Sequence, residues 1–439
     1  MKNNKIKIGI AGLGTVGSGV INLLNNNKDE ILKRTGCEFL VQCVSARNKD
    51  KARSCDINNI NFYTDPVDML ENEKIDIFVE LIGGDDIAKN IVTRAIEKKI
   101  HIVTANKALI ALHGTKINQL SLEKNCSVLY EASVAGAVPI IKVIKESLSA
   151  NKIQWIAGII NGTTNYILTE MLLSGKNFND VLDEAKELGY AESDPTFDIG
   201  GIDAAHKLTI LASICFGIPL NYDSVYVEGI EDIDLQDLNN AMELGYTIKH
   251  LAIARKSKYG IELRVHPCLV PNSRLLANVN GVKNAVVVNS DAAGPTLYYG
   301  AGAGSLATAS SVVSDIIDIV RNLSINSKKS TPFLGYMNNM VADQEILKIS
   351  NIESRYYLRI KVTNKPGVLA DITKIFGKKT ISIESILQKE ENEKDVNVPI
   401  VLVTHKIKEQ NLIEALLEIE NLDVVKDKII RIRIEELDS

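Results

Sequence analysis

The segment Leu188–Lys207, LGYAESDPTFDIGGIDAAHK, combines acidic side chains with a terminal lysine. Its acids are Glu192, Asp194, Asp198 and Asp203. The loop 192–202 contains proline and glycine and is expected to be irregular, whereas the apolar run after Asp203 predicts a largely buried helix. Because residues i and i+4 share one helical face, Asp203 can pair with Lys207. A lysine braced by an acid at such a boundary can donate a proton, and the alternative is a solvated acidic loop with a helix cap.

A glycine pattern near the start of the chain predicts a dinucleotide site. An apolar strand is expected over Lys5–Ala11, followed by GLGTVG at 12–17 and then a helix. This is the GxGxxG motif in its required strand, turn and helix context. Gly12 permits the tight turn, Gly14 lets the backbone approach a pyrophosphate, and Gly17 lets the helix pack closely on the strand. The helix N-terminus would offer N–H groups and partial positive charge to the phosphates.

The end of the second expected strand, Phe39–Ser45, bears on which cofactor is bound. A protein that binds NAD usually places Asp or Glu there to hold the ribose hydroxyls. Here Arg47 follows the strand, and more cations follow it, which suits the 2′-phosphate of NADP. Asp50 lies close enough to weaken this preference, and an exposed loop charge is the alternative, so NAD stays open.

The alternation of elements predicts the architecture. Strands alternate with helices over residues 1–131, which predicts a doubly wound parallel sheet of the Rossmann type. The further strands expected in this domain are Ile75–Leu81, Ile100–Thr104 and Ser127–Glu131. Residues 132–304 then predict an α+β domain with a mixed or antiparallel sheet. Its expected elements are a helix from Pro139 to about Leu148, a strand at Ile153–Ile160, a helix at Phe178–Leu188, strands at 224–230, 259–271 and 280–290, and a helix near 236–246.

The last third of the chain predicts a helix that packs back on the first domain, followed by a separate module. The glycine-rich run 297–304 is expected to be a loop, and the helix 305–322 after it is expected to complete the first domain. Residues 323–350 are polar, contain proline and glycine, and predict a linker. From residue 351 to 439 the pattern is βαββαβ, the ferredoxin-like split unit, which we expect to be a small independent module.

Bulk properties exclude several classes. At 439 residues the chain has room for about two or three domains. Its net charge of −5 offers no basic field for nucleic acid, and no apolar run approaches the ~20 residues of a membrane span. The six cysteines are scattered without CxxC spacing, and the first strand leaves no room for a signal peptide. We therefore expect reduced cysteines in a cytoplasmic protein.

Four stretches in order resemble the homoserine dehydrogenase family over residues 1 to about 322. They are GLGTVGSGV at the N-terminus, VTANKAL from Val103, NGTTNYI from Asn161, and the acidic segment above. The C-terminal module, with NKPGVL from Asn364, resembles an ACT domain. The resemblance implies nicotinamide-dependent, reversible reduction of L-aspartate 4-semialdehyde to L-homoserine, a step that precedes threonine and methionine synthesis. It also implies a homodimer or homotetramer formed through the middle domain, and an amino-acid effector such as threonine at the ACT domain.

The resemblance also implies roles for individual residues. The family's catalytic lysine falls on Lys207, a second active-site lysine on Lys107, and a supporting acid on Asp203. The substrate's amino group falls to Glu192, with Asp198 as a further acid that orients a lysine. Cofactor contacts fall on Leu13, Thr15, Val16, Arg47, Thr104, Lys107 and Gly302. A monovalent cation, sodium in the family, would be held by backbone carbonyls around Glu131, Val134, Gly136 and Val138.

Two other functions compete with this interpretation. A different Rossmann semialdehyde oxidoreductase would form an acyl-enzyme on a cysteine and would need a base beside it. None of the six cysteines lies in a glycine-rich turn with a candidate histidine. A non-catalytic sensor of dinucleotide and amino acid is the second alternative, and the two lysines with their carboxylate loop argue against it.

Overall fold

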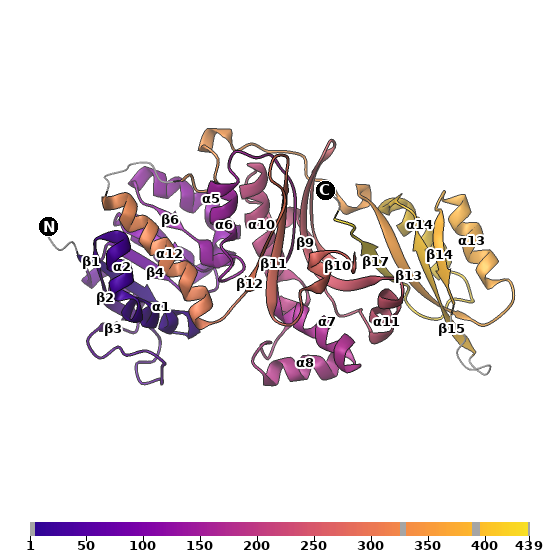
Figure 1. Cartoon of the computed structure of the whole chain (residues 1–439), viewed down its shortest axis with the longest axis horizontal. Helices are drawn as coiled ribbons and strands as arrows, with labels where there is room; N and C mark the ends of the chain where they lie inside the picture. The colour runs from indigo at the N-terminus through magenta and orange to yellow at the C-terminus, as the bar shows by residue number, and fades with distance from the viewer. Residues whose placement is uncertain (1–4, 325–330, 389–395, 438–439) are drawn as a thin grey trace.

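Three parts follow one another along the long axis of the molecule (Figure 1). The computed structural model describes residues 5–324, 331–388 and 396–437. A parallel sheet with its helices lies at one end, a mixed sheet with helices forms the middle, and a smaller α/β part lies at the other end. The predicted order of a Rossmann part, an α+β part and a ferredoxin-like part is confirmed. Among the described helices, none has both the length and the apolar character that crossing a membrane requires.

The first sheet has six parallel strands in the order β3-β2-β1-β4-β5-β6. They are β1 (Lys5–Ala11), β2 (Glu38–Ser45), β3 (Asn61–Tyr63), β4 (Ile77–Glu80), β5 (His101–Thr104) and β6 (Val128–Leu129). The order reverses between β1 and β4, and open sheets of this kind bind ligands at the carboxyl ends beside such a reversal. The sequence pattern misses β3, because a strand of three residues makes no apolar run.

Two helices from distant parts of the chain lie side by side on this sheet: α1 (Thr15–Asn26) and α12 (Ser305–Ser324) (Figure 1). Their apolar faces share one core with β1 and β4. A Cβ at Gly19 of α1 would lie 2.6 Å from the Ser305 carbonyl oxygen, so the close packing requires glycine. The other helices of this part are α2 (Lys28–Thr35), α3 (Pro66–Asn72), α4 (Asp86–Glu97) and α5 (Lys107–Lys124). The chain thus returns to its first sheet after the middle part.

The middle sheet is antiparallel except for β8, which pairs in parallel with β10, and it is longer than the sequence predicts. Its strands are β7 (Ile153–Ile159), β9 (Tyr246–Ser257), β10 (Gly260–Pro271), β11 (Lys283–Ser290) and β12 (Gly294–Ala301), with the short β8 (Tyr226–Val227) beside β10. The expected loop over 297–304 is wrong, because residues up to Ala301 pair with β11 as an edge strand. Of the expected strand 224–230 only Tyr226–Val227 forms, and β9 is not foreseen because Lys249 and His250 interrupt its apolar pattern.

The central helix α10 (Ile202–Phe216) lies between the two sheets and packs on α5, β7, β9 and β10. Nearly all of its residues are buried, which confirms the predicted buried helix. A helix that is apolar on all sides is expected where two layers enclose it. The remaining helices of the middle part are α6 (Ile140–Lys142), which continues as a π-helical turn over Val143–Ser147, α7 (Gly162–Ser174), α8 (Phe178–Glu187), α9 (Thr196–Ile199) and α11 (Leu235–Glu243).

The C-terminal part has the predicted βαββαβ order. Its elements are β13 (Glu353–Thr363), α13 (Val368–Lys378), β14 (Ile383–Leu387), β15 (Asn397–Thr404), α14 (Glu409–Glu420) and β17 (Ile430–Ile434), with the short β16 (Ile407–Lys408) paired to β13. This module is joined to the middle part by a short strand pairing. β17 pairs in parallel with β10 through Cys268–Arg433 and Leu269–Ile434, so the middle and C-terminal strands form one eleven-stranded sheet.

A buried set of charged side chains holds this shared sheet together, and we call it the junction cluster. Its members are Glu228, Glu262, Arg264, Glu409, Arg433 and Glu435. Arg264 on β10 pairs with Glu262 at 3.0 Å and with Glu435 beyond β17. Arg433 on β17 pairs with Glu409 of α14 and, at 2.7 Å, with Glu228 before β10. The two arginines therefore join the parts across the strand pairing.

The predicted linker follows the surface of the middle part as an ordered strap over residues 331–352. Phe333 and Leu334 are buried, the Tyr336 hydroxyl donates to the Cys215 carbonyl at 2.8 Å, and Ile346 forms a bridge with Ile261 of β10. Apolar side chains within this polar segment fasten it to α10 and β10. Residues 325–330, which belong to the expected linker, lie outside the described residues.

Candidate active site

Asp203 is the centre of a cluster of charged side chains. It lies in the first turn of α10, and its carboxylate is almost fully buried. Lys207 Nζ lies 2.6 Å from Asp203 Oδ2, and Lys107 Nζ lies 3.1 Å from Asp203 Oδ1. The predicted pairing of Asp203 with Lys207 along one helical face is confirmed. Lys107, at the start of α5, reaches the same carboxylate from the Rossmann part.

Three helices begin at this cluster. α5 begins at Lys107, α7 at Gly162 and α10 at Ile202. Helix N-termini carry partial positive charge, which favours an ionised acid between them. Gly201 precedes α10 with φ of +84°, and a Cβ there would lie 3.0 Å from a Val227 methyl group. Glycine therefore lets the chain turn from the acidic loop into the helix that carries Asp203 and Lys207.

The charge state of Asp203 follows from its contacts. Burial alone would raise the pKa of its carboxyl, but the charges of Lys207 and Lys107 and a hydrogen bond from Asn161 outweigh burial. The pKa of Asp203 is therefore held well below its usual range. An anion that is ionised so firmly gives the two lysines a fixed counter-charge at every physiological pH.

Lys207 has one donor hydrogen beyond those that hold it. Its ammonium bonds to Asp203 Oδ2 and donates to the Ile160 carbonyl at 2.7 Å. An ammonium group carries three donor hydrogens, so one is left for a further acceptor. The side chain is 13% exposed and that of Lys107 is 34% exposed, so both can meet a small molecule.

Asp198 on α9 is a second, differently held acid. Its Oδ1 accepts from Asn161 Nδ2 at 2.8 Å, and its Oδ2 accepts from Thr163 Oγ1 at 3.3 Å. Burial and the negative charge of Asp203 raise the pKa of Asp198, although the Asn161 bond opposes them. The cluster thus contains one firmly ionised acid and one that takes up a proton more readily.

The loop before α9 places the other predicted acids. Glu192 is exposed and forms no hydrogen bond or ion pair with any described residue, so the structure does not bring it to the lysines. Asp194 accepts from the Thr196 backbone N–H at 3.1 Å, and it therefore starts the turn into α9. His206 stacks on Tyr222 with ring centroids 4.4 Å apart, which is a structural contact.

The GxGxxG turn has the geometry that a pyrophosphate requires. Gly12 has φ of +98°, and a Cβ there would lie 2.3 Å from the Leu81 carbonyl oxygen. A Cβ at Gly17 would lie 2.0 Å from the Gly12 carbonyl oxygen, whereas the space within 4 Å at Gly14 is open. Leu13, Thr15 and Val16 complete the turn and the start of α1. The residues present therefore fit a dinucleotide at the N-terminus of α1.

A second helix N-terminus lies beside the first. Ser305 opens α12, and its hydroxyl donates to the Thr15 carbonyl at 2.8 Å. Gly302 lies just before α12 against the buried Asn284, whose Cγ would be 2.1 Å from a Cβ at that glycine. Two helix N-termini thus meet where the phosphates of a dinucleotide are expected, and both favour negative charge.

A buried acid lies at the carboxyl end of β4, between the turns that follow β4 and β5. Glu80, at the end of β4, accepts from Thr104 Oγ1 at 2.6 Å and from the Ile82 backbone N–H at 2.7 Å. Thr104 is fully buried at the end of β5, and its hydroxyl also accepts from the Asn106 backbone N–H at 3.0 Å. These bonds fix the turns after β4 and β5, which lead to Lys107.

Arg47 lies exposed beyond the end of β2, next to the glycine turn. The Gly12 backbone N–H donates to the Ser45 carbonyl at 3.0 Å, which ties that turn to the end of β2. The nearby Arg53 guanidinium donates to backbone carbonyls of its own loop, at 2.8 Å for Lys49 and for Lys51. Arg47 has no hydrogen bond to a described residue, so its charge is available to a ligand.

The candidate cation loop runs from Glu131 to Val138. Ala135 and Gly136 both have positive φ, +55° and +54°, which turns successive carbonyls in an irregular loop. The Gly136 carbonyl accepts from Ser311 Oγ at 2.7 Å, and the Val138 carbonyl accepts from the Ile140 N–H at 2.8 Å. A carbonyl has two lone pairs, so each can still contact a monovalent cation. In the described ranges, no group of three or more His, Cys, Asp or Glu side chains is gathered for a metal.

Sequence reasoning missed three polar residues of the site: Glu80, Asn161 and Thr163. The run NGTT from Asn161 carries a recognisable signal, because asparagine before a helix is a common cap. Asn161 does cap α7, and its Oδ1 accepts from the Thr164 N–H at 2.9 Å. Its bonds to the acids join residues far apart in the chain, and no local pattern announces them.

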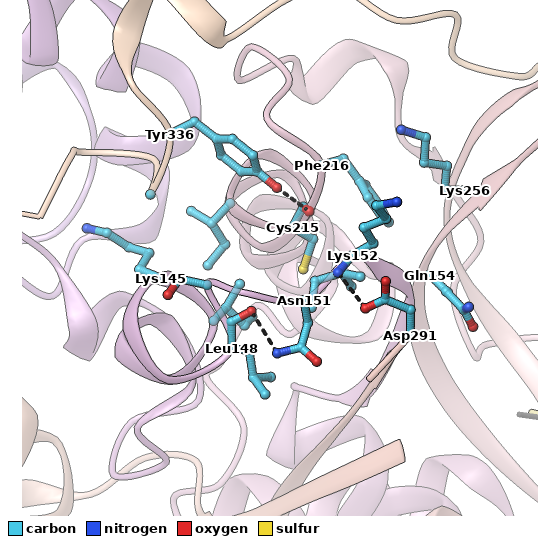
Figure 2. A pocket seen from close by; sticks show the side chains of 15 residues that line it. Lys145, Leu148, Asn151, Lys152, Gln154, Cys215, Phe216, Lys256, Asp291 and Tyr336 are labelled. Carbon is cyan, nitrogen blue, oxygen red and sulfur yellow. Dashed lines mark hydrogen bonds between the residues drawn. The ribbon is translucent and has the colours of Figure 1, made fainter. Parts of the chain in front are cut away.

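A cavity of about 570 Å³ lies at the opposite end of α10 from Asp203 (Figure 2). Figure 2 shows Tyr336 of the strap over the end of α10, with Lys152 and Asp291 on another wall. The Lys152 backbone N–H donates to Asp291 Oδ1 at 2.8 Å. The lining of this cavity includes neither Asp203 nor the two lysines, so the cavity is separate from the candidate active site.

Comparisons with known proteins agree along the whole chain. Family models described as "Homoserine dehydrogenase, NAD binding domain", "Homoserine dehydrogenase" and "ACT domain" match residues 12–131, 139–317 and 356–423. A homoserine dehydrogenase of Pseudomonas aeruginosa is 52% identical, over 98% of this chain and 99% of its own length.

Two solved structures extend this similarity. A homoserine dehydrogenase from Thiobacillus denitrificans has a TM-score of 0.94 at 49% identity and covers 99% of both chains. A hyperthermophilic archaeal homoserine dehydrogenase, solved in complex with NADPH, has a TM-score of 0.62 at 29% identity, over 72% of this chain and 97% of its own. The chain belongs to the homoserine dehydrogenase family, NAD(P)-dependent oxidoreductases that act on a CH–OH group.

Proposed function

We propose that this chain interconverts L-aspartate 4-semialdehyde and L-homoserine, with Lys207 as the proton donor and NADP as the preferred cofactor. One observation carries the proposal: two ammonium groups, one at the start of α5 and one in α10, share one buried carboxylate. Reduction of an aldehyde requires a proton and a positive environment for the developing alkoxide. The cluster offers both.

A nicotinamide dinucleotide held by the glycine turn and the N-terminus of α1 would supply the hydride that the aldehyde carbon takes up. Lys207 donates its remaining hydrogen to the carbonyl oxygen, and Lys107 stabilises the negative charge that develops there. Asp203 holds both ammonium groups in place without accepting a proton, because its pKa is well below the usual range. In the oxidation direction the same amine takes the proton back from the alcohol.

The acidic loop is assigned the binding of the substrate's amino group. Glu192 binds the substrate's ammonium group, and its lack of a protein partner leaves both carboxylate oxygens available. Asp198 lies between the loop and the cluster and orients Lys207 through its neighbours. Binding of the amino group at one end fixes which carbonyl oxygen meets Lys207.

Three further assignments belong to this proposal. Arg47 binds the 2′-phosphate of NADP, which its exposed and unpaired guanidinium supports. The rest of the cofactor site is lined by the three glycines of the GxGxxG turn and by Leu13, Thr15, Val16, Thr104, Lys107 and Gly302. A monovalent cation such as sodium binds the carbonyls of Glu131, Val134, Gly136 and Val138, where positive φ angles support such a loop.

The wider organisation follows the same family. We assign cofactor binding to residues 1–131 with helix 305–322, substrate binding and dimerisation to 132–304, and regulation by an amino acid such as threonine to 351–439. The assembly is a homodimer or homotetramer. All six cysteines are free, which supports a reducing, cytoplasmic setting.

The direct test is an assay of L-homoserine oxidation followed at 340 nm, with NADP and with NAD, in the presence and absence of threonine. We expect both NADP and NAD to be reduced. At low cofactor concentration the rate should be higher with NADP than with NAD, and threonine should lower the rate. Homoserine omitted from the mixture is the control. The absence of any absorbance change at high enzyme concentration would contradict the proposed reaction.

A further inference from the structure

The Asn161 side chain bridges the two acids of the site. Its Nδ2 donates one hydrogen to Asp198 Oδ1 and the other to Asp203 Oδ2, each at 2.8 Å. Asn161 is 5% exposed and lies between β7 and α7. Two carboxylates that would otherwise face each other therefore share one neutral donor group.

The orientation of this amide is fixed from its other side. Asn161 Oδ1 accepts the Thr164 N–H at the start of α7, so the NH₂ group must face the acids. The preceding residue supplies the Ile160 carbonyl that accepts from Lys207. One short segment thus contacts the acid pair with a side chain and the proton donor with its backbone.

We propose that Asn161 is a positioning residue that keeps Asp203, and not Asp198, paired with Lys207. The inference rests on the proposed role of Lys207. Without the two N–H donors, the acids would repel each other and compete for the ammonium. Lys207 would then lose its single fixed position relative to the substrate oxygen, and displacements of about 1 Å cost roughly 100-fold in rate.

The charges around the amide set the expected pH effect. The groups that face the acid pair are Lys107, Lys207, His206 and His250. Burial lowers the pKa of both histidines, so they add no charge near neutral pH. The pKa of Asp198 is already raised by burial and by Asp203, and the amide bond opposes this rise. An added carboxylate would raise it further.

The experiment compares Asn161→Asp and Asn161→Ser with a matched control, Asn177→Asp. Both aspartate and serine keep a helix cap, but neither bridges the two acids with an NH₂ group. Asn177 caps α8 in the same way and donates to Asp180 at 2.6 Å, but it lies outside the site. Rates are measured from pH 5 to 10, with NADPH affinity and melting temperature for each variant.

We expect Asn161→Asp to lower kcat about 100-fold and to move the acid limb of the pH profile up by about one unit. Asn161→Ser should lower kcat about tenfold with a smaller shift. NADPH affinity should stay unchanged in both, and Asn177→Asp should match the wild type. If Asn161→Asp does not fold, Asn161→Ser decides alone.

Two outcomes separate this inference from the proposed function. If Lys207→Ala is inactive while the Asn161 variants keep wild-type pH profiles and rates within threefold, Asn161 only caps its helix and the inference is overturned. If Lys207→Ala remains active, the assignment of the proton donor fails instead.

Discussion

The molecule contains two buried clusters of charged side chains, and they are built differently. In the junction cluster each arginine meets glutamates from more than one element, and the side chains of Arg264 and Arg433 are both 1% exposed. At the candidate active site a single carboxylate, Asp203, pairs with two lysines that remain partly exposed. The first arrangement satisfies its donors within the protein, and the second keeps an ammonium hydrogen for a ligand.

This difference separates structure from chemistry. A buried ion pair whose hydrogen bonds are all satisfied holds elements in register, and removing one partner leaves an uncompensated charge. A cluster with surplus charge next to a ligand crevice is a candidate for catalysis. Mutations in the two clusters should therefore change different quantities.

The largest effect is expected from Lys207→Ala. Loss of the proposed proton donor should lower kcat about 10³-fold, while NADPH binding persists because the glycine turn is untouched. Asp203 keeps Lys107 and Asn161 as partners, so the fold should survive. Steady-state rates and a fluorescence titration with NADPH check this. Turnover within tenfold of the wild type would remove Lys207 from its role.

Arg433→Met should lower the stability of the fold and leave kcat unchanged, the reverse of Lys207→Ala. Loss of Arg433 removes the ion pair of Glu228 and the closer of the two ion pairs of Glu409, which keeps Arg431 at 3.4 Å, and this should reduce the free energy of unfolding by about 3–5 kcal/mol. The kcat of the folded enzyme at 25 °C should stay unchanged. Urea unfolding and steady-state rates measure the two quantities. Lys428→Met, which breaks an exposed pair with Asp232, is the control and should change stability by less than about 1 kcal/mol.

Glu192→Ala sharpens the comparison at a carboxylate that has no protein partner. Its loss should raise the KM for homoserine about 30-fold, as expected for a charged hydrogen bond, and leave the melting temperature unchanged. Glu187→Ala, at the exposed end of α8, is the control for a nearby change of charge. A lower melting temperature with normal KM would make Glu192 a structural residue.

The pH dependence of stability should show the ionised state of Asp203. Its pKa is lowered in the folded protein, so its contribution to stability is present above the unfolded pKa of about 3.9 and is lost as the pH falls below that value. Asp203→Asn should flatten this acid limb. Urea unfolding of both proteins between pH 2 and 7 is the measurement. Parallel curves would show that the acid limb comes from other carboxylates.

The smallest effect is expected at Arg47, which is exposed and forms no ion pair with a described residue, unlike the arginines of the junction cluster. Arg47→Ser should raise the KM for NADP about tenfold, which corresponds to about 1.4 kcal/mol, and leave the KM for NAD unchanged. Initial rates with each cofactor measure it, and NAD is the internal control. An equal change for both cofactors would contradict a contact with the 2′-phosphate.

The features that sequence predicts well depend on neighbouring residues. The pairing of Asp203 with Lys207 follows from helical spacing, and the GxGxxG turn follows from glycines within one turn. The βαββαβ order is readable because each element carries its own apolar pattern. The structure agrees with the sequence in these three places.

The features that sequence misses depend on distant partners. The sequence does not predict β9, because Lys249 interrupts its apolar pattern. In the structure this side chain is buried, and its ammonium group donates a hydrogen bond to the Val279 carbonyl at 2.6 Å. The bridge from Asn161 to Asp198 and the pairing of β10 with β17 join segments that only the fold brings together. A linker composition over 323–350 likewise gives no sign that Tyr336 and Ile346 will anchor it.

The pairing of β17 with β10 has a consequence for anyone who wishes to shorten this chain. A truncation at residue 350 would remove the two residue pairs between β10 and β17 and leave backbone groups at Cys268 and Leu269 unpaired, a strand edge of the kind that invites aggregation. It would also deprive Arg264 of Glu435 inside the sheet. The C-terminal part therefore covers one edge of the middle sheet, and a shortened chain would need that edge redesigned.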